Sequence, residues 1–353
     1  MVNWPLALGR PGIAGNCITS RIWKGLKLNI LADRFGRAFP YLRLSITDAC
    51  NFRCQYCLPK GYRKTDKMSF LSVDEISRLL RTFAGLGMTK VRLTGGEPTL
   101  RRDLCEIATH AAAIPSVKTI ALTTNGYSLK KNAKAYFDAG INALNVSIDS
   151  SSPDKFFAIT GHDKLRLVQE GIAAAEEAGF KKIKINSVLI KGFNDGELTD
   201  FLAYIKNSDT SIRFIELMRT GDNQEYFAAH HLSSEIIIAQ LLELGFSAVP
   251  RQFDAGPAIE YQHRDYLGKI GIIAPYSKDF CKTCNRLRVT ARGKLMLCLF
   301  GEGGFDLRPF LQSDDQIQEL QDEILAALNF KVQSHHLQMG QTGTTQNLAA
   351  LGG

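Results

Sequence analysis

The sequence predicts an α/β protein whose main domain is a partial (βα)6 TIM-like barrel. Two observations support this prediction. From residue 41 onwards, six short runs rich in β-branched residues alternate with longer stretches of helical periodicity. Three of these helical stretches stop at a glycine, at Gly87, Gly140 and Gly179, as helices commonly do. Because successive βα units with right-handed crossovers lie parallel, we expect a curved parallel sheet with fewer units than the eight of a complete TIM barrel.

The expected elements follow one another as strand, loop and helix. The first strand covers Tyr41–Thr47, and the first helix covers 72–86, where Ser72 and Glu75 have the spacing of a capping box. The other barrel strands are expected at Lys90–Thr94, Thr119–Thr124, Ala143–Asp149, Lys182–Ile190 and Ser211–Leu217, and the other barrel helices at 102–113, 130–139, 164–178 and 196–206. After Leu217 the alternation stops, and we expect a helix at Ser233–Leu244 and another near 314–328 within irregular chain.

Three regions are therefore expected along the chain. Residues 1–38 form a flexible amino-terminal appendage, residues 39–217 form the barrel, and residues 218–353 form an extension that closes the barrel mouth. Most of the net charge of +8 belongs to the appendage, where six Lys and Arg residues stand against Asp33 alone. Because the remainder is nearly balanced in charge, we do not expect nucleic-acid binding.

The sequence also bears on the cellular compartment. It holds no run of about 18 uncharged apolar residues, which a membrane-spanning helix requires. The first residues lack the apolar core of a secretory signal. We therefore expect a cytoplasmic protein that does not bind membranes. In a reducing compartment, its eight cysteines serve metals or catalysis more readily than disulfides.

Three of the cysteines form a tight group directly after the first strand, in the segment CNFRCQYC at Cys50, Cys54 and Cys57. Structural zinc sites use four ligands, usually from two close pairs, and no further Cys or His follows the group until Cys105, which lies on a predicted helix. Three thiolates suit a cubane iron–sulfur cluster in which one iron stays open to a further ligand. On spacing alone, a zinc loop completed by a distant ligand is the alternative.

A second group of three cysteines lies in the extension, at Cys281, Cys284 and Cys298. A C-x2-C pair by itself is often structural zinc. Here the next candidate ligand after Cys298 is His335, in a poorly patterned tail. The presence of two three-cysteine groups in one chain favours two clusters over two zinc sites.

The first cysteine loop resembles that of the radical S-adenosylmethionine (SAM) superfamily, which has this spacing and an aromatic residue, here Tyr56, before the last cysteine. From about Phe39 to Gly353 the chain resembles the bacterial GTP 3′,8-cyclase family of molybdenum cofactor biosynthesis. The NRLR segment after Cys284, the stretch GDNQEYFAAHH at 221–231 and the terminal double glycine carry this resemblance. It implies two 4Fe–4S clusters and SAM as cofactors. The tail NLAALGG departs from the commoner Met-containing version, which leaves the residues before the glycines unassigned.

The resemblance also implies which residues bind SAM. In the family, the TGGEP motif, here Thr94 to Pro98, holds the amino group of SAM, and Gly96 is the matching position. Ser147 in the NVSID motif contacts SAM, and Met218 lines its adenine. Tyr56 and Glu97 complete this set. On the residues alone, a glycine turn, a capping cluster and a packed methionine are the alternatives.

Cations within the predicted strands suggest an anionic substrate. Arg43, Arg92 and Lys184 lie in strands, and Arg286 and Arg288 follow the second C-x2-C pair. Inward-pointing cations need partners, and arginine binds phosphate in bidentate geometry. Any one of them alone is equally well explained by a solvated or salt-bridged side chain.

The family resemblance turns this cationic set into a binding site for GTP. It implies substrate contacts for Arg43, Arg92, Thr123, Lys184, Arg286, Leu287 and Arg288, and catalytic roles for Cys50, Cys54, Cys57, Arg286, Arg288, Gly352 and Gly353. In the family, the double glycine threads into the active site. A free tail is the alternative from the sequence alone.

The function that the resemblance implies is that of a radical SAM lyase. It converts GTP to (8S)-3′,8-cyclo-7,8-dihydroguanosine 5′-triphosphate by removing hydrogen from C3′ and joining C3′ to C8. Expected partners are GTP, an electron donor such as flavodoxin or ferredoxin, and a downstream cyclic pyranopterin monophosphate synthase, with the chain a monomer or homodimer. The alternatives are another radical SAM enzyme with an auxiliary cluster, for instance one that modifies a peptide, and a zinc-stabilised nucleic-acid binder.

Overall fold

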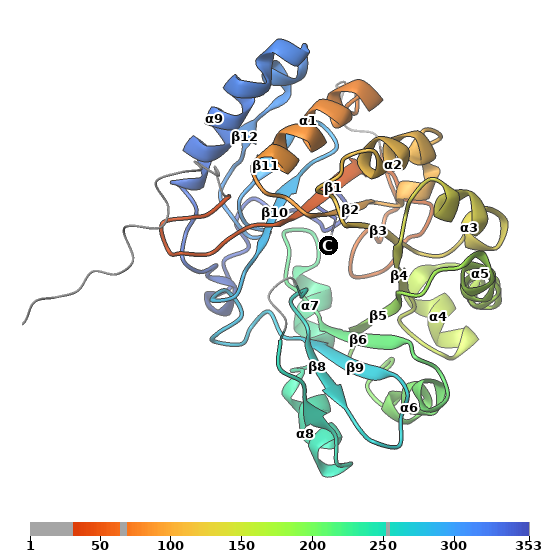
Figure 1. Cartoon of the computed structure of the whole chain (residues 1–353). Helices are drawn as coiled ribbons and strands as arrows, with labels where there is room; N and C mark the ends of the chain where they lie inside the picture. The colour runs from red at the N-terminus through yellow and green to blue at the C-terminus, as the bar shows by residue number, and fades with distance from the viewer. Residues whose placement is uncertain (1–30, 64–68, 252–254, 353) are drawn as a thin grey trace, which may run out of the picture.

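Six parallel strands form the centre of the sheet (Figure 1). They are β1 (Tyr41–Thr47), β2 (Lys90–Gly95), β3 (Thr119–Thr124), β4 (Ala143–Ser147), β5 (Ile183–Leu189) and β6 (Ser211–Glu216). The computed structural model describes residues 31–63, 69–251 and 255–352. Within these residues, the predicted α/β class and all six predicted barrel strands are confirmed, each close to its expected bounds.

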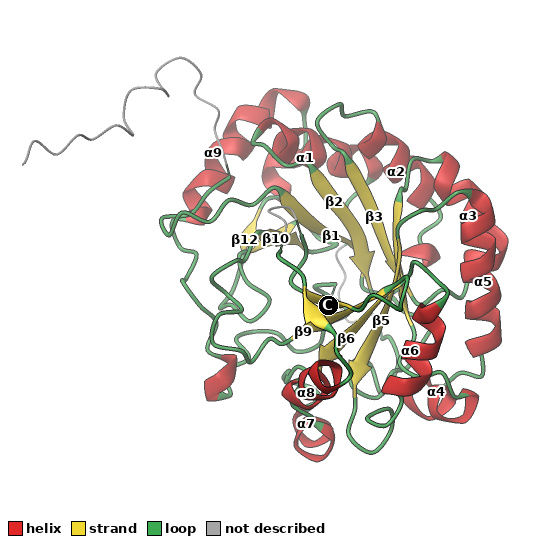
Figure 2. Cartoon of the chain, turned by 60° about the horizontal axis from the view of Figure 1, so that its bottom comes forward, coloured by secondary structure: helices red, strands yellow, loops and turns green. Residues whose placement is uncertain are grey.

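Helices cover the outer side of the strands (Figure 2). The expected ones are α1 (Val73–Gly85), α2 (Leu104–Ala112), α3 (Leu129–Asp138), α5 (Leu165–Ala178) and α6 (Leu198–Lys206). The capping box of α1 is confirmed, because the Ser72 side chain accepts from the Glu75 N–H and the Glu75 carboxylate accepts from the Ser72 N–H. A further helix that the sequence analysis missed, α4 (Pro153–Thr160), begins with proline and ends at Gly161 in the left-handed conformation.

Alternation along the strands separates an apolar outer face from a polar inner one. In β1, Leu42, Leu44 and Ile46 belong to the core under the helices, whereas Tyr41 and Arg43 line a cavity inside the arc of strands. Each fully buried leucine or phenylalanine contributes roughly 1.5 to 3 kcal/mol. The outer layer therefore stabilises the barrel and leaves the inner face available for polar side chains.

The extension adds a strand to each edge of this sheet. β9 (Lys269–Ile273) pairs parallel with β6, and β10 (Arg286–Val289) pairs parallel with β1, so that eight strands run parallel in the order β10-β1-β2-β3-β4-β5-β6-β9. Antiparallel strands continue it beyond both ends, with β8 (Ile259–Gln262) and β7 (Ser247–Ala248) after β9, and β11 (Lys294–Met296) and β12 (Phe305–Asp306) after β10. The extension thus takes part in the sheet itself.

The extension also holds short helices. The two expected ones are present as α8 (Glu235–Glu243) and α9 (Ile317–Leu328), and α7 (Gln224–His230) lies within the GDNQEYFAAHH stretch. Four 3-10 turns complete the described elements, namely η1 (Pro98–Leu100), η2 (Arg308–Leu311), η3 (Asp314–Gln316) and η4 (Leu337–Met339). No helix among the described residues is long and apolar enough to cross a membrane.

Residues 31–38, the described part of the predicted appendage, pack against the fold. Leu31 is buried, and its N–H donates to the Leu86 carbonyl at 3.0 Å. Arg37 pairs with Asp33 and donates to the Cys281 carbonyl and to the Val332 carbonyl. The described chain is therefore already packed against the fold at Leu31. Residues 1–30, which include Cys17, lie outside the described residues.

The other end of the chain runs into the arc of strands, where Figures 1 and 2 mark the carboxyl terminus. Leu348, Ala349 and Leu351 are all buried there. The predicted penetration of the tail into the barrel agrees with this position up to Gly352, and Gly353 lies outside the described residues.

Candidate functional site

A cavity of about 150 Å³ lies beside the first cysteine group, at the carboxyl ends of the central strands. All three cysteines of that group line it. The five residues predicted to bind SAM line it as well, namely Tyr56, Gly96, Glu97, Ser147 and Met218. The structure therefore brings together the whole predicted SAM set, from the carboxyl end of β4 and the chain that follows β1, β2 and β6.

Gly95, the last residue of β2, and Gly96, the next residue, allow close packing between two segments of the chain. A Cβ atom on Gly95 would lie 1.9 Å from the Thr47 carbonyl oxygen, and one on Gly96 would lie 2.2 Å from the Ala49 carbonyl oxygen. The close approach is held by the Gly96 N–H, which donates to the Thr47 carbonyl at 3.0 Å. Because any side chain here would push the two segments apart, the glycines fix the position of the cysteine loop relative to the cavity.

The Glu97 carboxylate joins two loops by hydrogen bonds. Its two oxygens accept from the Thr99 N–H and hydroxyl, from the Thr124 hydroxyl at 2.8 Å and from the Asn125 N–H at 2.6 Å. Burial raises the pKa of Glu97, and these hydrogen bonds oppose the rise. With both oxygens engaged, Glu97 shapes the cavity by joining the ends of β2 and β3.

Tyr56 is held by a residue that the sequence analysis quoted but did not assign. Its hydroxyl donates to the Asp149 carboxylate at 3.0 Å, and the Val188 N–H donates to the other oxygen of Asp149 at 2.9 Å. Burial raises the pKa of Asp149 to about 6. The Asn223 side chain donates to the Tyr56 carbonyl at 3.1 Å, which ties the α7 region to the cysteine loop.

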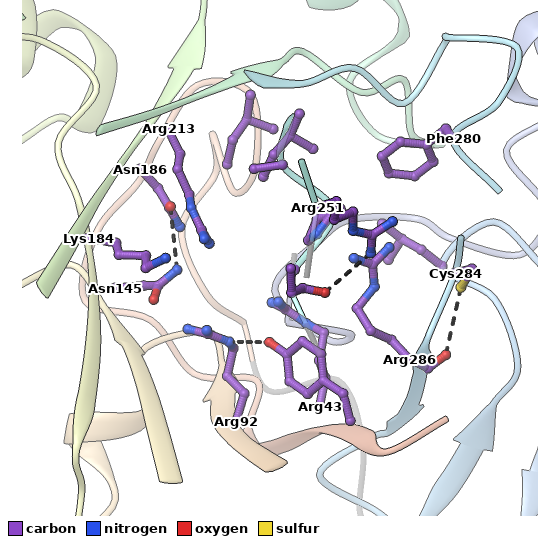
Figure 3. Close-up of a pocket in the computed structure, with 18 of the residues that line it drawn as sticks. Arg43, Arg92, Asn145, Lys184, Asn186, Arg213, Arg251, Phe280, Cys284 and Arg286 are labelled. Atoms are coloured by element: carbon purple, nitrogen blue, oxygen red, sulfur yellow. Dashed lines mark hydrogen bonds between the residues drawn. The ribbon is translucent and has the colours of Figure 1, made fainter. Parts of the chain in front are cut away.

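A second cavity, of about 420 Å³, is lined by residues of the central strands and of the extension (Figure 3). The second cysteine group lines it, together with all five predicted cations, Arg43, Arg92, Lys184, Arg286 and Arg288. The strand register explains this convergence, because Arg43 is paired with Arg92 on one side and with Arg288 on the other. Leu287, also predicted to contact substrate, is 1% exposed and packs in the core, so any such contact comes from its backbone.

Further cations line this cavity that the sequence analysis did not name, namely Lys90, Lys182, Arg213, Arg251 and Lys269. A signal for Arg213 was present, because it stands between Ile212 and Phe214 in a buried strand, as Arg92 stands between Val91 and Leu93. Among the described lining residues, Glu260 is the one carboxylate, and it lies 3.3 Å from the Lys184 ammonium and 3.4 Å from the Arg213 guanidinium.

The crowding of positive charge lowers the pKa values of several cations in the cavity. Burial, together with the charge of Arg213, lowers the pKa of Lys184 to about 8. Burial and the neighbouring Arg92 and Arg286 lower the pKa of Arg43 to about 10. The pKa of Arg288 is lowered well below its ordinary value by burial and by Arg43. Because the cations destabilise one another, the cavity favours a ligand with several negative charges.

The two cavities adjoin. Asn186, Ile215 and Met218 line both of them. Thr123, predicted to contact the nucleotide, lines the smaller cavity and accepts from an Arg92 guanidinium N–H at 2.9 Å. Molecules bound in the two cavities would therefore meet at this shared wall.

The carboxyl-terminal tail reaches the same cations. The Gly352 carbonyl accepts from Arg43 Nε at 3.0 Å and from Arg288 Nη1 at 2.8 Å, and the Leu351 carbonyl accepts from Arg288 Nη1 at 3.1 Å. Hydrogen bonds also join the backbone at Leu348 and Ala349 to the Cys57 thiol. The tail thus links the first cysteine group to the cationic cavity.

The donor set of each cysteine group suits an iron–sulfur cluster. All six thiols are free and partly buried, and each group lines its own cavity. Among the described residues, no three Cys, His, Asp or Glu side chains are placed to share a single ion, whereas in a cubane cluster each thiolate binds a separate iron. Burial raises the pKa of Cys50 to about 11 and of Cys57 to about 12, so bound metal is required to keep these thiols deprotonated.

Comparisons with known proteins agree with this arrangement. Residues 44–205 match the family model described as Radical SAM superfamily, and residues 210–337 match the one described as Molybdenum Cofactor Synthesis C. The two models meet before β6, earlier than the expected domain boundary after Leu217.

Individual relatives cover nearly the whole chain. A protein of Stenotrophomonas maltophilia strain K279a named GTP 3′,8-cyclase is 54% identical over 92% of this chain and 99% of its own length. One of the same name from Yersinia pestis is 53% identical over the same shares. The crystal structure of Streptococcus suis SuiB bound to S-adenosylmethionine superposes with a TM-score of 0.57 over 83% of this chain and 68% of that one. At 14% identity, that structure shows a shared fold alone.

Proposed function

The chain belongs to the GTP 3′,8-cyclase family of radical SAM enzymes, and from this premise we propose that it converts GTP to (8S)-3′,8-cyclo-7,8-dihydroguanosine 5′-triphosphate. One observation carries the proposal: two adjoining cavities each hold three free thiols, and only the larger is walled by cations. When bound, a cluster held by Cys50, Cys54 and Cys57 would supply the electron for reductive cleavage of SAM. Removal of a hydrogen atom from C3′ of GTP, formation of the C3′–C8 bond and addition of one electron and one proton to the cyclised nucleotide would complete the conversion.

In this proposal the smaller cavity orients SAM. Cys50, Cys54 and Cys57 hold the first cluster beside it. The chain at Gly96 accepts the amino group of SAM, Ser147 contacts SAM, and Met218 lies at the wall shared with the larger cavity, against the adenine. The buried tail residues Leu348 and Ala349 line the same cavity and exclude water from it.

The larger cavity binds GTP. Its volume of about 420 Å³ lies within the usual range for small-molecule sites. Cys281, Cys284 and Cys298 hold the second cluster at the guanine end, and the cations fix the triphosphate. Besides the five predicted cations, we add Lys90 and Arg213 to the triphosphate contacts, because both line the same wall. Through Thr123, Arg92 also connects the substrate cavity to the SAM cavity.

We also propose the setting in which the enzyme works. SAM cleavage consumes one electron from the cluster, so a reducing protein such as flavodoxin or ferredoxin is needed as donor. The product then passes to a cyclic pyranopterin monophosphate synthase. The proposed location is the cytoplasm, with the enzyme a monomer or homodimer.

Anaerobic incubation with SAM, a reductant and GTP deuterated at C3′ tests this function. We expect deuterated 5′-deoxyadenosine together with the cyclised triphosphate. Release of 5′-deoxyadenosine without deuterium would favour a radical SAM enzyme acting on another substrate. Purified protein that binds zinc instead of iron, and forms no 5′-deoxyadenosine, would favour the nucleic-acid binder.

Replacing Glu97 with glutamine should weaken SAM binding selectively. The new amide would place its NH2 group either against the Thr99 and Thr124 donors or against the Asn125 N–H, and the loops that the carboxylate joins would shift. Hydrogen bonds to a charged group are worth about 1.5 to 3 kcal/mol, so we expect the KM for SAM to rise about 10- to 100-fold while GTP binding is kept. Steady-state kinetics and GTP titration measure the two effects.

Glu197→Gln is the matched control. Glu197 is also a buried carboxylate, and it accepts from Ser150 and Ser151, but it does not line either cavity. We expect it to lower thermal stability without changing the KM for SAM. If both variants changed that KM equally, the proposed role of Glu97 in shaping the cavity would be wrong.

GTP binding should weaken as the pH rises through about 8. The pKa of Lys184 lies there, below its ordinary value, so the free enzyme loses this cation above that pH and keeps it below. In Lys184→Arg the charge persists, and we expect the part of the loss that sets in near pH 8 to disappear. Binding titrations from about pH 7 to about pH 9 measure it. Lys206→Arg, outside the cavity, should behave as wild type, and an identical pH profile for Lys184→Arg would contradict the assignment.

A further inference from the structure

Tyr41 lies in the middle of the cationic wall of the larger cavity, and nothing in the proposed function uses it. In the sheet register, Tyr41 on β1 is paired with Arg286 of β10 and with Lys90 of β2. Two residues further on, Arg43 is paired with Arg288 and Arg92 in the same way. Because alternate residues of a strand share a face, Tyr41 is surrounded by five cations on the inner face of the sheet.

The contacts of the phenol are those of an anion. Tyr41 is 3% exposed, and Arg92 Nε donates a hydrogen bond to its oxygen. Arg43 hydrogen-bonds the same oxygen, and a guanidinium can only donate. The Lys90 ammonium lies 4.9 Å from the centroid of the ring. An oxygen that accepts from two cationic donors in this way is favoured as phenolate.

The charges around Tyr41 come from four strands. Arg43 stands on β1, Lys90 and Arg92 on β2, Arg286 and Arg288 on β10, and Arg213 on β6 also interacts with the phenol. Burial alone raises the pKa of Tyr41, but Arg92, Arg43 and Lys90 outweigh it and lower this pKa to about 6. The carboxylate of Glu260 lies instead against Lys184 and Arg213.

We propose that Tyr41 is a resident anion of the empty substrate cavity, which holds Arg43 and Arg92 in place and takes up a proton when the triphosphate of the substrate enters. The inference rests on the proposed function, since it requires GTP in this cavity. In this step the phenolate oxygen gains one proton from solvent. The triphosphate then supplies the negative charge that the phenolate has lost beside the arginines. A like charge arriving nearby disfavours the phenolate, which drives this uptake.

Tyr41 then acts as a positioning residue, and its titration gives GTP binding a pH dependence that a residue with a packing role alone would not give. In wild type, GTP affinity should fall as the pH rises above about 6, because binding then requires the phenolate to be protonated. This pH range begins below the range in which Lys184 loses its proton, near pH 8. In Tyr41→Phe the lower slope should vanish and only the upper one remain. At about pH 6, binding to the variant should be about 10-fold weaker, because the two arginines lose a shared acceptor.

Calorimetric titration of the anaerobic, cluster-loaded enzyme with GTP, at about pH 7.5 and in two buffers of different ionisation enthalpy, counts the protons taken up. We expect Tyr41→Phe to take up close to one proton fewer than wild type; the ionisation of GTP itself cancels in this comparison. Tyr136→Phe is the control, since Tyr136 is also buried but bonds Ser128 away from the cavity, and it should match wild type. In wild type and in Tyr136→Phe, but not in Tyr41→Phe, GTP should also diminish the long-wavelength absorption band of tyrosinate.

Equal proton uptake by wild type and Tyr41→Phe would overturn the inference while leaving the proposed function intact. Failure of the wild-type enzyme to bind GTP at all would overturn both. Iron content and melting temperature, measured on all three proteins, show whether a change in binding arises from loss of clusters or of folding.

Discussion

Replacing Gly352 with alanine is expected to lower kcat/KM for GTP by about 100-fold or more, since small displacements within an active site cost that much. Gly352 has φ +61°, and a Cβ atom there would lie 2.2 Å from Thr94 Cγ2, at the end of β2. The alanine must therefore move the tail away, which breaks the hydrogen bonds of the Gly352 carbonyl with Arg43 and Arg288. The measurement is product formation by enzyme with both clusters loaded, with iron content unchanged.

A matched control is present in the same chain. Gly303 has φ +64°, and a Cβ atom added there meets nothing within 4 Å. Gly303→Ala therefore carries the same backbone strain without the collision, and we expect nearly full activity. If Gly352→Ala were as active as Gly303→Ala, the tail would be a passive cover and its contacts with the arginines dispensable.

The second large effect concerns the division of labour between the two cysteine groups. Cys284→Ala removes one ligand from the second group and should lower iron content by about half. Cyclisation of GTP should fall at least about 1000-fold, because the substrate loses its orientation. SAM cleavage in the presence of reductant should continue, since the smaller cavity and its three thiols are untouched. Separate assays of 5′-deoxyadenosine and of cyclised product measure the two activities.

Two further variants serve as controls for this result. Cys54→Ala breaks the first group and should abolish both activities, whereas Cys105→Ala removes a free thiol outside both groups and should change neither. If Cys284→Ala lost SAM cleavage to the same degree as Cys54→Ala, the two centres would act as one unit, and the assignment of SAM to the smaller cavity alone would be wrong.

The barrel could be predicted from the sequence because its elements are long and periodic. The capping box at Ser72 and the glycine at the end of α5, Gly179, gave local boundaries that the structure matches. The strands of the extension could not be predicted in this way. β10 has four residues and follows a cysteine loop, and nothing local indicates that it pairs with β1.

The candidate site was predictable where residues carry chemistry of their own. The six cysteines and five of the cations lie where the motifs suggested, around two cavities. Arg213 could have been added by applying to β6 the reasoning used for Arg92. The roles of Glu97 and Tyr41 depend on neighbours from other strands, Thr124 and Asn125 for one and Arg43, Lys90 and Arg92 for the other. Only the assembled sheet reveals them.

The pairing of β10 with β1 also bears on the order of events during folding. Tyr41 pairs with Arg286, which lies far along the chain, and Arg43 donates to the Gly352 carbonyl. Contacts between such distant segments form late in folding, because the long intervening loop must close first. The wall of the larger cavity is therefore expected to form after the local βα units. Iron and sulfide delivered to the second cysteine group would then meet a barrel that has already folded.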